Sequence, residues 1–203
     1  MIKGEELLLH PQRACFWNNK STLILSDLHL GKAGHFRKHG IPISKQVHIT
    51  DLSFLDQLID ELKVNRVLLL GDLFHSLENL EWLDFINFME KHSTTEFILV
   101  QGNHDILEKY PDRLKVLPKL IEAPFSFTHI RERDNFYNIS GHIHPGVTIR
   151  GRARQGITMP CFLFSKEHAI LPAFGQFTGI KKIKPLKTDR VFAIADRQIV
   201  ELR

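Results

Sequence analysis

The sequence has little cysteine and no long hydrophobic run. Its 203 residues include 2 cysteines, Cys15 and Cys161, which are far apart and lie in apolar stretches. So few cysteines, without CxxC spacing, argue against a disulfide framework and the usual zinc or redox motifs, and we expect two buried thiols. No window approaches eighteen consecutive apolar residues, so no transmembrane helix is expected.

The composition is that of an ordinary globular protein. Hydrophobic residues make up 43% of the sequence and charged residues 25%, which is enough apolar material for a real core. The length and the lack of repeats or linkers favour a single domain over residues 1–203. Met1 to Glu6 lack the pattern of a signal peptide, so we expect a soluble protein in the cytoplasm.

Charge and histidine content narrow the function further. The 27 basic residues exceed the 23 acidic ones and give a net charge of +4, which permits a phosphate-rich partner without requiring one. The 12 histidines are more informative, because histidine is seldom buried without a purpose and is the commonest metal ligand.

The first half of the chain alternates predicted strands and helices. The predicted strands are 7–9, 14–17, 22–25, 66–70 and 97–100. Amphipathic helices are predicted at about 44–62 and at 79–91 from the spacing of their apolar residues. This alternation is typical of a parallel sheet covered by helices.

The second half contains short strand candidates with few helices between them. They are 125–128, 136–140, 147–149, 162–164, 169–171 and 191–195. The two halves together predict an α/β fold in which a sandwich of two β-sheets is flanked by helices.

Residue types that bind metals follow five of the predicted strands. They are Asp27 with His29, Asp72, Asn103, His129, and His142 with His144. In open α/β sheets, ligands bind outside the carboxyl ends of the strands. We therefore expect these side chains to converge on one crevice.

The spacing of these residues suits metal binding. Residues two apart at a strand end can face the same side, so Asp27 and His29 can hold one ion together, and the same holds for His142 and His144. The nearby glycines at 71, 102 and 141 would let the backbone turn sharply and approach the ions. Carboxylate, amide and imidazole ligands suit manganese, iron or zinc better than calcium.

Each motif taken alone has a plainer explanation. Asp-x-His often only caps a turn, and Gly-Asp is a common turn dipeptide. The sequences GNHD at 102–105 and GHIH at 141–144 are more specific because each follows an apolar strand. All of the motifs together are hard to explain structurally, because ionisable residues seldom cluster in a core.

In this order, the motifs resemble those of the calcineurin-like metallophosphoesterase superfamily: DxH, GDxxD, GNH(D/E), a lone His and GHxH. Residues 27–144 carry this pattern. The segments 26–32, 35–42, 160–162 and 171–179 resemble more narrowly the bacterial DNA ligase-associated metallophosphoesterases, a family of DNA damage response endonucleases. The resemblance implies the metallophosphoesterase two-sheet sandwich, with residues 1–203 as one such domain.

The resemblance also implies a role for each motif residue. The implied metal ligands are Asp27, His29 and His144 on one ion, Asn103, His129 and His142 on the other, and Asp72 between both. His104 would be a catalytic residue beside the scissile phosphate, as a donor to the transition state or an acid to the leaving oxygen. The two ions would be divalent transition metals, manganese first, with iron or zinc as alternatives.

One position departs from the family pattern. His75 stands where GDxxD has its last aspartate. The residue at that position usually supports a metal ligand without binding the metal. We therefore expect altered metal-binding properties and not the loss of the metal site, with His75 packed in the structure or supporting a ligand.

Basic residues near the motifs are candidate substrate contacts. Arg150, Arg152 and Arg154 alternate after the GHIHP turn and, if extended, would form a basic ridge close to the metals that attracts phosphodiesters. The alternative is an edge strand protected by its charge. Arg37 and Lys38, in the loop after the first motif, are further candidates, with a merely solvated loop as the alternative.

The leading functional hypothesis is a two-metal phosphodiesterase that cuts single-stranded DNA in repair, with a metal-activated water as nucleophile. The metals and ester hydrolysis follow from the residues, whereas DNA follows from the resemblance and the mild basic excess. The alternatives are a phosphoesterase or pyrophosphatase for a small nucleotide-type substrate and an inactive scaffold. The resemblance further implies a functional association with a DNA ligase and a helicase.

Overall fold

The computed structural model describes residues 1–32, 46–74, 80–107, 109–133, 135–150 and 155–202, without the side chains of 46–49 and 80–81. Five residues discussed above lie outside this part of the chain: Arg37, Lys38, His75, Arg152 and Arg154.

The first β-sheet has six strands in chain order. They are β1 (Leu7–His10), β2 (Ala14–Trp17), β3 (Thr22–Leu25), β4 (Arg66–Leu70), β5 (Glu96–Val100) and β6 (Leu114–Leu117). The first three pair antiparallel, and β3 to β6 pair parallel. All five strands predicted in this half are present, whereas β6 was not predicted.

The second sheet is built from the rest of the chain. Its path is β13 (Lys181–Lys182), β10 (Pro145–Arg150), β11 (Gly156–Phe164), β12 (His168–Ile170), β9 (Tyr137–Ser140), β8 (Phe125–Phe127) and β7 (Leu120–Glu122). A hairpin of β14 (Arg190–Ala195) and β15 (Gln198–Leu202) pairs with β11. Strands β7, β13 and β15 were not predicted.

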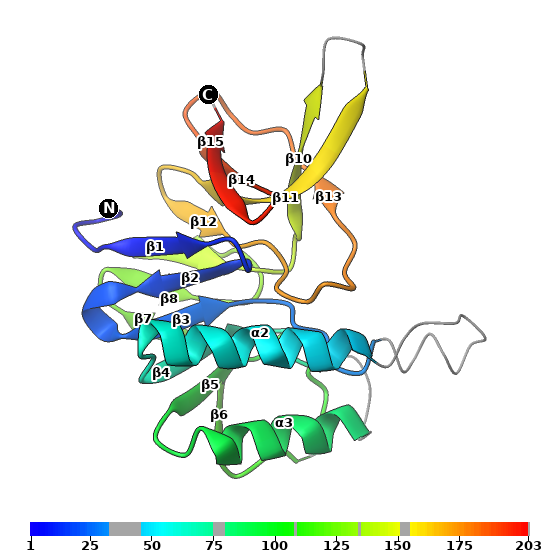
Figure 1. Cartoon of the computed structure of the whole chain (residues 1–203). Coiled ribbons are helices and arrows are strands. Elements are labelled where there is room, and N and C mark those ends of the chain that lie inside the picture. Colours follow the sequence, from blue (N-terminus) through cyan, green and yellow to red (C-terminus); the bar gives the residue numbers. More distant parts are fainter. Residues whose placement is uncertain (33–45, 75–79, 108, 134, 151–154, 203) are drawn as a thin grey trace.

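The first sheet is buried on both faces. Helices α2 (Gln46–Leu62) and α3 (Leu80–Lys91) cover one face, and the second sheet covers the other (Figure 1). Because strand side chains alternate, Val67 and Leu69 of β4 pack towards the helices, whereas Leu68 and Leu70 pack towards the second sheet. The predicted sandwich of two sheets flanked by helices is confirmed.

The prediction of two buried thiols is also confirmed. Cys15 and Cys161 are free and buried, and burial raises the pKa of each thiol to about 12, so neither is reactive. In the described part of the chain, neither helix is long and apolar enough to cross a membrane.

The loop after β3 is fixed on one side by the loop after β4. The backbone N–H of Asp27 donates to the carbonyl of Gly71 at 3.1 Å, and that of His29 donates to the carbonyl of Asp72 at 2.9 Å. The two loops therefore continue the parallel pairing of β3 and β4 beyond the regular sheet, and hold Asp27, His29 and Asp72 together.

A segment that we call the strap, residues 171–179, fixes the other side of the same loop. The backbone N–H of Phe174 donates to the carbonyl of Ser26 at 2.8 Å, and that of Gly175 to the carbonyl of Asp27 at 3.3 Å. The strap follows β12, so it ties the second sheet to the end of β3.

Two charged side chains anchor the strap. The guanidinium of Arg13 donates to the carbonyls of Ala173 and Gly175 at 3.4 and 3.2 Å. The carboxylate of Asp51, on α2 and only 3% exposed, accepts the backbone N–H of Gln176 at 3.1 Å. Burial raises the pKa of Asp51 to about 7, although the Gln176 N–H and the charge of Arg13 act to lower it.

The raised pKa of Asp51 predicts a specific pH dependence of stability. Between the unfolded value of 3.8 and about 7, the folded chain holds a proton that the unfolded chain has lost, so this group makes stability fall as pH rises through that window. Asp51→Asn removes the effect, and its free energy of unfolding relative to wild type should increase from about pH 5 to about pH 8 in urea titrations.

Asp56→Asn, on the same helix, is the control. Burial acts to raise the pKa of Asp56, but hydrogen bonds from Lys91 and His92 lower it overall, so its titration falls below this pH window. The expected pH dependence would be contradicted if the difference in free energy of unfolding between Asp51→Asn and wild type were the same at about pH 5 and about pH 8.

Candidate metal centre

The His and Asp residues singled out in the sequence form two neighbouring clusters. One contains Asp27, His29 and His144, the other Asp72, His129 and His142, and in each the potential ligand atoms lie within 4.8 Å of one another. The side chains come from the carboxyl ends of β3, β4, β8 and β9, as predicted from the strand ends. Asn103, after β5, joins the second cluster with Oδ1 3.0 Å from Nε2 of His129.

In the first cluster, a backbone carbonyl sets the orientation of His144. Its Nδ1 lies 3.1 Å from the carbonyl oxygen of Gly179, at the end of the strap. A carbonyl only accepts, so Nδ1 donates to it and Nε2 is left for the first cluster. Nε2 lies 3.3 Å from Oδ1 of Asp27, a carboxylate oxygen that only accepts.

The second cluster repeats this arrangement at His129. Its Nδ1 lies 2.9 Å from the carbonyl of Leu70 and therefore donates to it. Its Nε2 then faces three potential ligand atoms: Asn103 Oδ1 at 3.0 Å, His142 Nδ1 at 3.1 Å and Asp72 Oδ1 at 3.3 Å. Carbonyl-supported imidazoles of this kind are typical of metal ligands.

Asp72 lies between the two clusters. Its Oδ1 is the oxygen near His129, while its Oδ2 is 3.9 Å from Nε2 of His29 in the first cluster. The pKa of Asp72 is lowered to about 2, because hydrogen bonds from the His129 ring and the His104 backbone N–H outweigh burial, which raises it. The side chain is therefore an ionised carboxylate that reaches both clusters at neutral pH.

The imidazoles differ in their readiness to bind a cation. Burial and, secondarily, the charge of Lys32 lower the pKa of His29 to about 3, and burial together with His129 lowers that of His142. At His129, burial lowers the pKa, but Asp72 and the Leu70 carbonyl raise it more. A metal ion at its Nε2 would compete with that proton.

The backbone at the two paired motifs is not extended, which corrects our explanation of their spacing. Asp27 and His29 have φ values of 55° and 50°, and His142 and His144 have 67° and 50°, so each lies in the left-handed region. Such residues cost about 1–2 kcal/mol each when they carry a side chain. The side chains converge because left-handed residues alternate in each loop, and the strain is concentrated at the candidate ligands.

The glycines of the motifs meet a second expectation in part. Gly71 has a φ of 77°, as a sharp turn requires, whereas Gly102 and Gly141 make room for ligands. A Cβ on Gly102 would lie 2.4 Å from Oδ1 of Asp72, and one on Gly141 would lie 2.6 Å from Oδ2 of Asp27. Neither glycine has a positive φ, so close approach explains them and not a sharp turn.

The arrangement fits a pair of divalent cations. Oδ1 of Asp27 is buried and accepts no hydrogen bond from the described residues. A buried carboxylate oxygen without a donor is unfavourable, and so are lone pairs that face other acceptors. Cations between these atoms would remove both problems, and the mixed Asp, His and Asn donors suit transition metals.

His104 lies at the edge of the centre. Its backbone N–H donates to Oδ1 of Asp72 at 3.0 Å, which fixes the residue beside the second cluster. Its side chain is 44% exposed, with Nε2 4.0 Å from Oδ2 of Asp72. The imidazole is therefore accessible to solvent beside Asp72.

Asp105 is a supporting residue whose role we did not predict, although it belongs to the GNHD motif. Its buried carboxylate accepts the backbone N–H groups of Leu73, Phe74 and Gly102 at 2.9, 3.1 and 2.8 Å. It thereby joins the loop after β4, which carries Asp72, to the loop after β5, which carries Asn103.

Arg150 is not beside the centre. It is the last residue of β10, which starts next to His144, and a six-residue strand spans roughly 20 Å. The expected closeness of this arginine to the metals is therefore not found, and its contact with substrate stays a prediction.

Gly141→Ala should disrupt the first cluster, because the added methyl group would collide with Ser26 and with Oδ2 of Asp27. We expect fewer than two manganese ions per folded chain by elemental analysis. Gly179→Ala is the matched control, since nothing lies within 4 Å of its added Cβ. Equal metal content in the two variants would contradict this account of the glycine.

One solved structure supports the fold, and two others are similar to a lesser degree. The crystal structure of Pseudomonas putida nuclease MPE has a TM-score of 0.83 and 24% identity, covering 99% of this chain and 97% of that one. YfcE, a phosphoesterase from E. coli, has a TM-score of 0.44 and 14% identity, covering 89% and 97%. A Streptococcus pneumoniae TIGR4 protein described as a predicted phosphoesterase has 0.33 and 14%, covering 89% and 86%.

Comparison with protein families gives the broader assignment. No curated protein sequence matches the chain. The calcineurin-like phosphoesterase family model matches residues 20–178, which include both clusters and most of the strap. The chain therefore belongs to the calcineurin-like phosphoesterase family and is a hydrolase of phosphoric esters.

Proposed function

We propose that this protein is a two-metal phosphodiesterase that cuts single-stranded DNA internally, in DNA repair in the cytoplasm. The observation that carries the proposal is the position of Asp72, whose two carboxylate oxygens face different clusters in a phosphoesterase fold. A carboxylate there can bridge two cations and screen their mutual repulsion.

The proposed ligands of the first cation are Asp27, His29 and His144, and those of the second are Asn103, His129 and His142, with Asp72 shared. Manganese is the first choice, with iron and zinc as alternatives, because the donor set mixes oxygen and imidazole nitrogen. We further propose that residues 1–203 form one metallophosphoesterase domain.

When bound, the two cations would supply Lewis acidity towards the phosphoryl oxygens and lower the pKa of the attacking water. The chain contributes orientation, since carbonyl groups fix the rings of His129 and His144 and the surrounding loops hold the carboxylates. His104 is the proposed catalytic residue: its exposed imidazole can donate to a phosphoryl oxygen or protonate the leaving oxygen.

DNA as the substrate is supported by similarity and charge. The fold matches that of a nuclease over almost the whole of both chains. The net charge of +4 favours a polyanion, and Arg150 is a proposed contact for a part of the strand remote from the metals. A functional association with a DNA ligase and a helicase belongs to the proposal through the family resemblance alone.

The test is nicking of circular single-stranded DNA with added manganese, which requires internal cleavage. Asp72→Ala should lose more than about 100-fold of the activity, and more than Asp27→Ala, because it removes the ligand shared by both cations. Asp112→Asn, at an exposed aspartate, should behave as wild type.

A wild-type chain that hydrolyses only small phosphate esters would overturn DNA as the substrate while leaving the hydrolase intact. A metal-loaded chain without activity on any ester would favour the inactive scaffold. An Asp72→Ala variant that cuts DNA at the wild-type rate would overturn the shared-ligand mechanism.

A further inference from the structure

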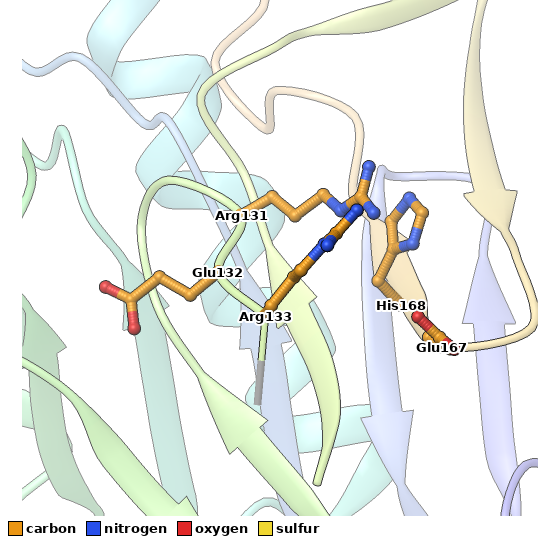
Figure 2. A pocket seen from close by; sticks show the side chains of 5 residues that line it. All are labelled: Arg131, Glu132, Arg133, Glu167 and His168. Atoms are coloured by element: carbon orange, nitrogen blue, oxygen red, sulfur yellow. The ribbon is translucent and has the colours of Figure 1, made fainter. Parts of the chain in front are cut away.

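A polar cavity lies beside the segment that leads away from His129. It has a volume of about 360 Å³ and is lined by Arg131, Glu132, Arg133, Glu167 and His168, which we call the arginine pocket. In Figure 2 the side chains of Arg131 and Arg133 converge on the imidazole of His168, while Glu132 points away.

The basic groups of the pocket lack partners within the described chain. Neither Arg131 nor Arg133 makes a hydrogen bond or an ion pair with a described residue, although two guanidinium groups repel each other when they converge. The carboxylate of Glu132 is already bound to Lys119, at 2.9 Å. Among the described lining residues, Glu167 is therefore the one carboxylate left to offset the two arginines, which leaves an excess of one positive charge among these residues.

His168 adds a buried polar group to the same cavity. The residue is only 7% exposed, and its ring makes no hydrogen bond with any residue that the structure describes. Its pKa is lowered by burial first and then by the charge of Arg131, so the ring is neutral and faces a guanidinium. A neutral imidazole of this kind can donate one N–H to an anion, beside the two arginine forks.

Short segments of chain join both walls of the pocket to the metal centre. Arg131 follows His129 by two residues, so their Cα atoms are at most about 7 Å apart. His168 begins β12, and the strap starts immediately after that strand. The pocket is therefore separated from the metal centre by two residues along one wall and by the three-residue strand β12 along the other.

We propose that the arginine pocket binds a phosphodiester group of the single strand, a neighbour of the phosphate that is cleaved. The excess of one positive charge matches the single negative charge of a phosphodiester, and the forked guanidinium groups match its oxygens. The cavity is large enough for a phosphate with its sugar. This inference rests on the proposed DNA substrate and adds a place where the strand is held away from the metals.

The experiment compares wild type with Arg131→Gln/Arg133→Gln in the full chain. Binding of a short fluorescent single-stranded oligonucleotide is measured in EDTA by anisotropy, over a range of salt concentrations. Hydrolysis of bis(p-nitrophenyl) phosphate with manganese is measured in parallel, because this small diester engages the metals without reaching the pocket. Thermal melting verifies that each variant is folded.

We expect the oligonucleotide Kd of the double variant to rise about tenfold, because charged hydrogen bonds to phosphate are lost. The salt dependence, as the slope of log K against log salt, should fall by about 0.7 for the lost phosphate contact. Hydrolysis of the small diester should keep its wild-type kcat and KM. Lys115→Gln/Arg197→Gln removes the same charge from exposed residues elsewhere and should bind as wild type.

The possible failures are distinguishable. Equal oligonucleotide binding by the two double variants would overturn the pocket and leave the nuclease proposal standing. If the double variant loses small-diester hydrolysis and DNA binding equally, the two arginines stabilise the metal centre instead of binding the strand. This result would also overturn the proposed role of the pocket. A wild-type chain that hydrolyses the small diester but neither binds nor cuts single-stranded DNA would overturn both proposals.

Discussion

The structure depends on buried acceptor atoms that face one another. The Nε2 atoms of His129 and His144 lie 3.3 Å from carboxylate oxygens of Asp72 and Asp27, and each of these pairs needs a proton or a cation between its two atoms. Backbone carbonyls hold the opposite nitrogen of each ring, so the rings cannot turn away without losing a hydrogen bond. Such an arrangement is unfavourable without positive charge between the acceptors, and this requirement explains why the site suits two cations.

Much of the surrounding structure keeps these acceptors in place. The loops after β3 and β4 pair with each other beyond the sheet, and the strap is hydrogen-bonded to the loop after β3. Asp105 joins the loop after β4 to the loop after β5. Left-handed backbone at the candidate ligands is strained, and it persists because these neighbours fix the chain on both sides. The preorganised site therefore lowers the stability of the fold, and hydrolysis of phosphoric esters needs such fixed ligands.

The fold class could be predicted from the sequence, and so could the convergence of the His and Asp residues of both clusters. Residue types that bind metals, placed directly after predicted strands, are a strong local signal. Strands β6, β7, β13 and β15 were not predicted, because short strands in a mixed sheet are stabilised by neighbours that are remote in sequence. The explanation of the Asp27 and His29 spacing was wrong, because left-handed backbone is too rare in non-glycine residues to be predicted from residue type, even though Asp and His are enriched there. The contacts of Asp51 and Arg13 with the strap could not be predicted either, because they join residues that are remote in the sequence.

The central claim is that two cations share the carboxylate of Asp72. Electron paramagnetic resonance of the manganese-loaded chain tests it most directly, because two Mn²⁺ ions roughly 4 Å apart are magnetically coupled. When two ions are bound per chain, we expect the spectrum of a coupled pair. A spectrum of isolated Mn²⁺ at full loading, or saturation at one ion per chain, would contradict it.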